Sequence, residues 1–155
     1  PQPYYQVRNP FSLFYVLKNS LLHRCYLTDL FGTDFLSQKK RIQVTVVLWN
    51  YTANQKVYLQ FFVNKQTPTL TTLWFSATWL ERELWEMFGV VSVGHTDLRR
   101  LLTDYGFQGF PLLKDFPVTG YVELRYSEKQ KRVVSRAVSF VQEFRLFDFQ
   151  SPWQK

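Results

Sequence analysis

The sequence predicts a small α+β domain: an antiparallel or mixed sheet packed with two helices, followed by a long ordered loop and an extended C-terminal arm. Three observations predict it: an amphipathic helical pattern opens the chain, two alternating segments follow, and a second helical pattern has well-marked ends. This order of elements is typical of a small α+β sandwich. We expect residues 1–126 to form the domain, including an interaction loop over 90–120, and residues 127–155 to form the arm.

The first helix is expected at about 10–23. Asn9 and Pro10 are the residue types that favour an N-cap and a first helical position. Apolar residues then recur at spacings of three and four, which places them on one helical face. They are Phe11, Phe14, Leu17 and Leu21, with Leu13 alongside.

Two strands are expected over 42–49 and 57–63, where apolar and polar residues largely alternate. Asn50 to Lys56 between them is a polar loop of hairpin length. A weaker strand is expected over Tyr26 to Phe35, with a turn at Gly32 interrupting it.

The second helix has the clearest end signals. Thr78 and Glu81 match the S/T-x-x-E capping box, and Gly89 matches the left-handed position that follows a helix. Arg82 and Glu86 are four residues apart, and we expect them on the solvent side as a weak ion pair. The expected buried stripe consists of Leu80, Leu84, Met87 and Phe88.

Residues 90–120 show no sustained period of a helix or strand, and only Leu98 to Asp104 fits a helical turn or two. Irregular loops longer than about 12–15 residues are uncommon in compact domains unless they bind something or are disordered. Disorder does not fit a segment this rich in Leu, Phe and Tyr. We therefore expect an ordered binding surface, after which a short strand over Tyr121 to Tyr126 returns the chain to the domain.

The C-terminal segment is ambiguous between two structures. Residues 132–144 have apolar residues at helical spacing, but their valine content equally favours an extended strand. Phe144 to Trp153 alternates aromatic and charged residues, so we expect an arm that lies across a neighbouring molecule.

Composition indicates a partner. The chain carries a net charge of +7 and has fifteen Phe, nine Tyr and five Trp residues, more aromatic rings than a small core can hide. The partner classes that this surface fits are nucleic acid, an anionic membrane surface and other protein subunits. The net charge is +6 over residues 1–80, −2 over 81–126 and +3 over 127–155. The excess thus avoids the long loop, and Lys39-Lys40-Arg41 is the only basic triplet. A basic RNA-binding module stays an alternative, although no RNA-recognition motif occurs.

The chain has few groups suited to redox or metal chemistry. Its one cysteine, Cys25, cannot form an internal disulfide or hold an iron–sulfur cluster by itself, and His23 and His95 have no companion ligands. We expect no cofactor or metal in this chain and a reducing compartment. No secretory signal or bilayer-spanning run is visible, and the first residue, Pro1, suggests a true N-terminus further upstream.

Two constellations could support catalysis, and each also has a structural interpretation that we favour. Glu81, Glu83 and Glu86 lack the Glu-x-x-His repeat of a di-metal helix, so we favour a solvated or interface face. His95 with Asp97, Arg99 and Arg100 could form a base and an anion clamp. We favour a loop held by its own Asp–Arg pairs, and Lys114-Asp115 has the same two interpretations. A freestanding His and carboxylate enzyme stays an alternative.

Several linked motifs resemble one family, the 30-kDa-type subunit (also known as the subunit 9 type or the C type) of respiratory complex I, the proton-translocating NADH:ubiquinone oxidoreductase. The strong resemblance covers about 79–153, and departures occur at Thr96, Phe110 and Leu113, where the family often has Pro, His and Arg. The motifs are ERELWEMFG from Glu81, GHTDLRR from Gly94, LTDYGF from Leu102, KDFP from Lys114, GYVELRY from Gly120, QEFR from Gln142 and SPW from Ser151.

The resemblance implies a core, cofactor-free subunit of the hydrophilic arm, needed for assembly and for positioning the quinone-site subunit. FMN, the iron–sulfur clusters, NADH and ubiquinone would be bound elsewhere in that complex, and the chain would have no catalytic centre. The implied partners are the 49-kDa-type quinone-site subunit and adjacent iron–sulfur subunits, with no nucleic acid and with membrane association only through the complex. We expect the matrix side of the mitochondrial inner membrane, or alternatively the cytoplasmic side of a bacterial plasma membrane. The implied interface residues are Glu81, Arg82, Glu83, His95, Asp97, Arg99, Arg100, Asp104, Lys114, Asp115, Phe116 and Trp153.

Overall fold

The computed structural model describes residues 4–6, 10–19, 25–142, 144–145, 147 and 149–153. The chain separates into two compact units, Pro1–Phe116 and Pro117–Lys155, and each is described by itself below. The predicted α+β class is confirmed, because a mixed four-stranded sheet and two helices make up the regular part of the first unit. The predicted division into a 1–126 domain and a 127–155 arm stays a prediction.

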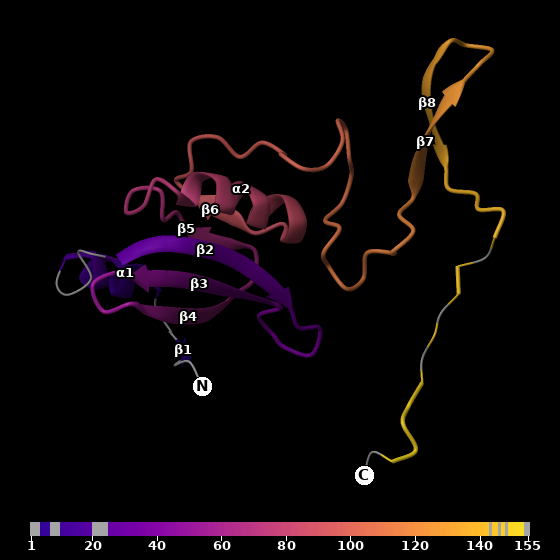
Figure 1. Ribbon diagram of the computed structural model, residues 1–155. Helices are drawn as coiled ribbons and strands as arrows, with labels where there is room; N and C mark the ends of the chain where they lie inside the picture. The colour runs from indigo at the N-terminus through magenta and orange to yellow at the C-terminus, as the bar shows by residue number, and fades with distance from the viewer. Residues whose placement is uncertain are drawn as a thin grey trace. The chain divides into compact units, whose positions relative to one another are not determined.

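The first unit is built on one sheet with the strand order β1-β4-β3-β2 (Figure 1). The strands are β1 (Tyr4–Gln6), β2 (Cys25–Asp34), β3 (Ile42–Asn50) and β4 (Gln55–Val63). β2, β3 and β4 form an antiparallel meander, and β1 adds to the edge of β4 in parallel. The two predicted central strands and the short turn between them are confirmed.

β2 runs without a break through Gly32, so the predicted interruption there is wrong. The one irregularity in its pairing with β3 falls between Leu27 and Asp29. A Cβ at position 32 would lie 2.8 Å from a ring carbon of Phe88 and 3.0 Å from a methyl carbon of Leu84. Glycine is therefore required at this position by the close approach of a helix and not by a turn.

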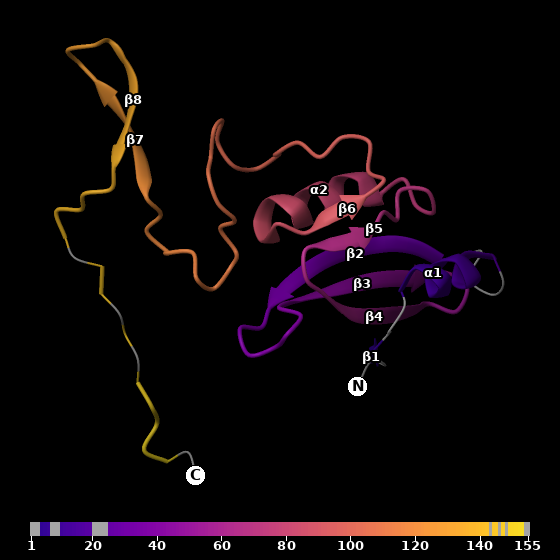
Figure 2. The same cartoon turned by 180° about the vertical axis from the view of Figure 1, so that it is seen from behind.

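Both views show α2 (Ala77–Phe88) and the short strands β5 (Gln66–Pro68) and β6 (Val91–Val93) on the same side of this sheet (Figure 1, Figure 2). The core lies between them, and Val44, Val46 and Leu48 of β3 are completely buried in it. Alternate residues of a strand point to the same face, which is why these three positions share the core. Leu84 of α2 is buried against them, and Leu80 and Phe88 pack on the same cluster half-buried.

α1 spans Pro10–Asn19. Its Phe14 is 1% exposed and makes edge-to-face contacts with Phe61 and Trp74, at centroid distances of 6.1 and 6.2 Å. The predicted N-cap Asn9 and the predicted last turn with Leu21 lie outside the described residues, as do the side chains of Phe11 and Leu17.

The end of α2 is as predicted, but its beginning is not. Gly89 adopts the left-handed conformation at φ 75°, and its N–H donates to the Trp85 carbonyl. The predicted capping box is wrong, because the helix already begins at Ala77 and Thr78 lies within its first turn. The Thr78 hydroxyl donates to the Phe75 carbonyl, and the Glu81 carboxylate faces the segment that precedes the helix.

The predicted solvent-side ion pair of Arg82 and Glu86 is also wrong. Both side chains are buried, Glu86 completely, because the segment after the helix folds back over this face. The hydrophobic pattern could not show this, since the covering segment has no period of its own.

The structure differs from the prediction in two further places. β6 (Val91–Val93) pairs in parallel with β5 (Gln66–Pro68), and neither strand was predicted, because three-residue strands are too short to show an alternating pattern. No helix forms over Leu98 to Asp104, because the backbone N–H groups of residues 101–103 donate to the Glu86 side chain and not to carbonyls one turn earlier.

The second unit contains an antiparallel hairpin of β7 (Val122–Ser127) and β8 (Arg132–Ala137). The predicted strand over 121–126 is thus confirmed within a residue, and its partner among the described strands is β8. The ambiguity over 132–144 is decided in favour of an extended chain for 132–137. The described residues of 138–153 contain neither helix nor strand.

The approach of α2 to Gly32 gives a stability prediction. We expect Gly32→Val to lower the free energy of unfolding by about 1–3 kcal/mol, because the branched side chain would overlap the Phe88 ring. Thr33→Val, on the adjacent exposed residue, is the matched control and should change it by less than about 0.5 kcal/mol. Urea unfolding followed by tryptophan fluorescence measures both, and equal effects would contradict this packing.

Candidate functional site

The candidate site is the irregular segment 94–116, which we call the anchored loop. It contains no helix or strand, yet three polar anchors attach it to the helix and sheet of the first unit. Buried backbone groups outside regular structure need other hydrogen-bond partners, so these anchors decide the path of the loop.

Glu86 is the first anchor. Its carboxylate accepts hydrogen bonds from the N–H of Leu101 at 2.6 Å, of Leu102 at 3.0 Å and of Thr103 at 2.5 Å. The Thr103 hydroxyl adds a fourth donor at 2.6 Å. Burial opposes ionisation, but these donors outweigh it and hold the pKa of Glu86 at about 2. The carboxylate is therefore a charged structural group at neutral pH.

Glu81, which lies earlier on α2, holds a different segment, the one that precedes the helix. It is completely buried, and it accepts hydrogen bonds from the Leu70 N–H at 2.5 Å and from the Thr69 hydroxyl at 2.7 Å. Thr69 in turn donates its N–H to the Val93 carbonyl next to the β5–β6 pair. Glu81 thus joins α2 to the segment before it and has no free face for chemistry.

The beginning of the anchored loop is held by Arg82 and His95. The Arg82 guanidinium donates to the carbonyl of Arg99 at 3.0 Å. The His95 Nδ1 accepts the N–H of Asp97 at 3.0 Å, so its Nε2 carries the proton and donates to the Thr78 carbonyl at 3.2 Å. Both ring nitrogens are occupied within the chain, which argues against His95 as the base of a freestanding enzyme.

Asp97 and Arg99 form the local pair that the sequence favoured. Two carboxylate–guanidinium contacts of 2.9 Å join them, and the bonds from Arg99 lower the pKa of Asp97. The Arg99 side chain is 75% exposed, so this pair contributes little to stability. It leaves a charged group on the outer surface of the loop.

Arg100 is the second anchor. Its guanidinium lies over the rings of Trp85, Phe107 and Phe110, with the guanidinium carbon 5.5–5.8 Å from their centroids. It also donates to the carbonyl of Gly109 at 3.0 Å. A cation over aromatic faces is attracted by the negative charge of the ring faces, so Arg100 gathers both halves of the loop around itself.

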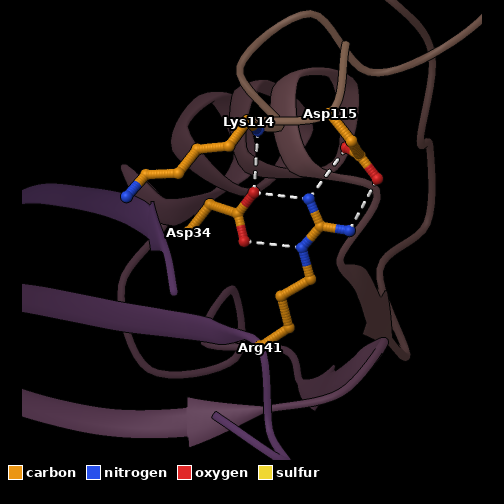
Figure 3. Close-up of polar contacts among 4 residues, drawn as sticks. All are labelled: Asp34, Arg41, Lys114 and Asp115. Atoms are coloured by element: carbon orange, nitrogen blue, oxygen red, sulfur yellow. Dashed lines mark hydrogen bonds and ion pairs between the residues drawn. The ribbon is translucent and has the colours of Figure 1, made fainter. Parts of the chain in front are cut away.

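The third anchor is an ion triad of Asp34, Arg41 and Asp115 (Figure 3). Arg41 donates to both oxygens of Asp34 at 2.6 Å and to those of Asp115 at 2.8 and 2.9 Å. The Lys114 N–H also donates to Asp34, at 2.8 Å. The bonds from Arg41 are the largest cause that lowers the pKa of both carboxyl groups. The triad fixes the end of the loop to the turn between β2 and β3.

Sequence reasoning missed Asp34 and Arg41, although Arg41 belongs to the basic triplet. Its partner Asp115 is far along the chain, and no local pattern signals a pair of that separation. Lys114, the sequence neighbour of Asp115, contributes its backbone and not its charge to this cluster.

The predicted interface residues divide by exposure. Glu81 and Arg82 are buried, so neither presents its charge on the surface of this chain. His95, Asp97, Arg100 and Phe116 are half-buried within the loop. The exposed ones are Glu83, Arg99, Asp104, Lys114, Asp115 and, in the second unit, Trp153. Their contact with another subunit stays a prediction.

Three apolar side chains lie beside these charges, and only Trp79 lies outside the segment that the sequence predicts to be a binding surface. Trp79, Leu102 and Tyr105 are 60%, 65% and 103% exposed, and with Arg99 they line an open groove along the anchored loop. Exposed large apolar side chains gathered in one place are typical of a binding surface. Tyr105 lies beside Gly106, and this turn was a visible signal in the sequence.

Among the described residues, no group of three or more His, Cys, Asp or Glu side chains could hold a metal ion. Cys25 is buried, and burial raises the pKa of its thiol. The expectation that the chain holds no cofactor stays a prediction. None of the helices among the described residues is long and apolar enough to cross a membrane.

Comparisons with known proteins agree with the resemblance. Residues 9–122 match the family described as "Respiratory-chain NADH dehydrogenase, 30 Kd subunit". The chain is 45% identical over 152 residues to "NADH-ubiquinone oxidoreductase subunit 9" of Reclinomonas americana, which covers 95% of the chain and 74% of that protein.

Two further relatives cover 83% of the chain each. The C-type NADH-quinone oxidoreductase subunit of Novosphingobium aromaticivorans is 52% identical over 130 residues, and the match spans 42% of its length. "NADH dehydrogenase (ubiquinone) iron-sulfur protein 3" of Solanum tuberosum is 49% identical over 131 residues, and the match spans 69% of its length.

The Glu86 anchor predicts an acid-dependent stability. The folded pKa lies below the ordinary value of 4.5, so its contribution to stability is complete above about pH 4.5 and is lost as the pH falls towards 2. We expect Glu86→Gln to remove this pH dependence and to cost about 2–3 kcal/mol at pH 7. Urea unfolding at several pH values measures it. Glu83→Gln, exposed on the same helix, should keep the wild-type profile, and an unchanged profile in Glu86→Gln would contradict the anchor.

The ion triad predicts a second effect. We expect Arg41→Ala to lower the free energy of unfolding, because it leaves the buried Asp34 carboxylate without its charged partner. Hydrogen exchange should rise at the backbone of residues 110–116, while Lys40→Ala, the exposed neighbour, should change neither quantity. Normal protection of 110–116 in Arg41→Ala would mean that the triad does not hold the loop.

Proposed function

Since the chain belongs to the family of 30-kDa subunits of respiratory-chain NADH dehydrogenase, we propose that it is a structural subunit of the hydrophilic arm of a proton-translocating NADH:ubiquinone oxidoreductase. Its role would be to support assembly and to position the quinone-site subunit during electron transfer. The anchored loop is the observation that carries this proposal.

The loop supports a docking role because its internal contacts leave its outer surface free for a partner. The anchors use Glu86, Arg100 and the Asp34–Arg41–Asp115 triad to fix an irregular segment in one conformation. A surface fixed before binding loses less conformational entropy on association than a mobile one. The side chains that this arrangement turns outward include Trp79, Leu102 and Tyr105.

The second unit supports the same role. In the β7–β8 register, Val122, Leu124 and Tyr126 share one face with Val133 of β8, and all four are more than half exposed. Two-stranded hairpins are marginally stable by themselves in water, so a covering partner would stabilise this one. The described residues beyond the hairpin expose further rings, namely Phe140, Phe144, Phe147, Phe149 and Trp153.

The charged groups of the site support a role without catalysis in this chain. Glu81, Glu86 and His95 are each committed to hydrogen bonds within the fold. The potato relative is named an iron–sulfur protein, but an iron–sulfur cluster is usually held by four thiolates and this chain has one cysteine. We therefore propose that FMN, the clusters, NADH and ubiquinone are bound by other subunits.

The finer assignments are also proposals. The partners would be the 49-kDa-type quinone-site subunit and adjacent iron–sulfur subunits, met by Glu83, Asp97, Arg99, Asp104, Lys114, Phe116 and Trp153. Glu81, Arg82 and Arg100 would act indirectly by holding this surface in place. The location would be the matrix side of the mitochondrial inner membrane, or the cytoplasmic side of a plasma membrane if the source is bacterial.

Native gel electrophoresis of detergent-solubilised membranes tests the proposal. The tagged chain should migrate in a very large assembly with NADH dehydrogenase activity. We expect Arg99→Ala to lower the amount of this assembly several-fold, because it removes an exposed charge of the docking surface, while turnover per assembled complex stays nearly normal.

Lys56→Ala is the control, because it removes an exposed cation of β4 that lies outside the anchored loop, and it should assemble normally. Migration of the wild-type chain as a free protein would contradict the proposed function. Normal assembly of Arg99→Ala with abolished turnover would instead indicate direct chemistry.

A further inference from the structure

A second groove of the first unit is lined by no residue of the anchored loop, and we call it the lysine groove. Lys39 and Lys40 from the turn after β2 and Lys65 from the connection between β4 and β5 line it. Phe61, Phe62 and Pro68 also line it. The groove therefore combines three cations from two separate loops with an apolar part.

The charges of this groove are uncompensated within the described chain. Lys39, Lys40 and Lys65 are exposed, and none makes an ion pair or side-chain hydrogen bond with another described residue. No carboxylate is among the described residues that line it. Arg41 at the same place differs, because Asp34 and Asp115 take up both sides of its guanidinium. The unmatched charge of the groove is thus carried by lysine ammonium groups alone.

The other lining groups favour an extended polypeptide. Phe62 is half-buried and rests edge-on against Phe35, so its accessible part offers an apolar contact. Asn64 and Gln66 are exposed and carry amide groups that can both donate and accept. Cations, amides and an apolar contact in one groove suit a chain with carboxylates and interspersed apolar side chains.

We propose that the lysine groove docks an acidic, extended segment of a neighbouring protein chain. No residue of the anchored loop lines this groove, so the inference goes beyond the proposed function. Charge complementarity selects the partner, because a carboxylate-rich segment would neutralise three otherwise unmatched ammonium groups.

Nucleic acid and lipid fit the same groove less well. Base stacking needs an accessible aromatic face, but Phe61 is 4% exposed and Phe62 is half-buried in an edge-on contact with Phe35. The Arg41 guanidinium, the fork best shaped for phosphate, is already engaged. Clusters that bind anionic membranes usually hold about four to eight cations, and this groove has three free ones.

Zero-length cross-linking in the assembled complex tests the proposal. A carbodiimide joins lysine amines to carboxylates only where the two are already in contact. We expect mass spectrometry to find Lys39, Lys40 or Lys65 joined to Asp or Glu residues of another polypeptide. Cross-links only within this chain, or none at these lysines, would overturn the proposal.

Reversing the charge of one groove lysine tests whether the cross-links depend on the groove. Lys65→Glu should reduce the cross-links that remain at Lys39 and Lys40 by about tenfold, because it places a repelling carboxylate beside the bound segment. Lys56→Glu changes the net charge equally at the other end of β4 and should leave the yield unchanged. Equal losses in both variants would overturn the proposal.

Two binding assays test whether the lysine groove binds lipid or RNA instead. Binding of the purified complex to vesicles of phosphatidylcholine with anionic phospholipid, or to single-stranded RNA, is compared between Lys65→Glu and Lys56→Glu. A selective loss in Lys65→Glu would assign the groove to lipid or RNA and overturn the proposal, while equal binding supports it. A chain found in the large assembly without these cross-links overturns only the groove, whereas absence from the assembly overturns the proposed function.

Discussion

The hydrogen bonds from the backbone of residues 101–103 to the Glu86 carboxylate are the contact on which the rest of the site depends. They place an acceptor with a full negative charge under three successive backbone donors of a segment that has no regular structure. A carboxylate buried without such donors would be costly, and a buried loop without such an acceptor would leave its N–H groups unpaired. Each side of the contact therefore makes the other tolerable.

Hydrogen bonds between charged side chains and irregular segments recur elsewhere in the first unit. Glu81 accepts from the segment before α2, Arg82 donates to the loop after it, and Asp34 accepts from both Arg41 and Lys114. Charged side chains of α2 thus bind the irregular segments that precede and follow the helix. Fully satisfied polar networks of this kind specify one arrangement, because every alternative leaves a buried charge unpaired.

This arrangement changes how the charges of the site should be understood. The Glu, Arg and His residues of the motifs suggest chemistry or direct contact, yet several of these groups hold the backbone in place. The outer surface is left to Trp79, Arg99, Leu102 and Tyr105, a mixture of apolar and charged groups suited to recognition. The lysine groove is a different case, since its three lysines form no ion pair with a described anion.

The sequence by itself determined the elements whose signals are local. The alternation of β3 and β4, the end of α2 at Gly89 and the irregular, ring-rich loop were all predictable from neighbouring residues. The family resemblance likewise came from short motifs in order. Only the tertiary structure decided what covers Glu86 and Arg82, why Gly32 is a glycine, and that Asp115 pairs with Arg41. Each of these depends on contact between segments distant in sequence, and helical or strand periodicity carries no information about which distant segment will approach.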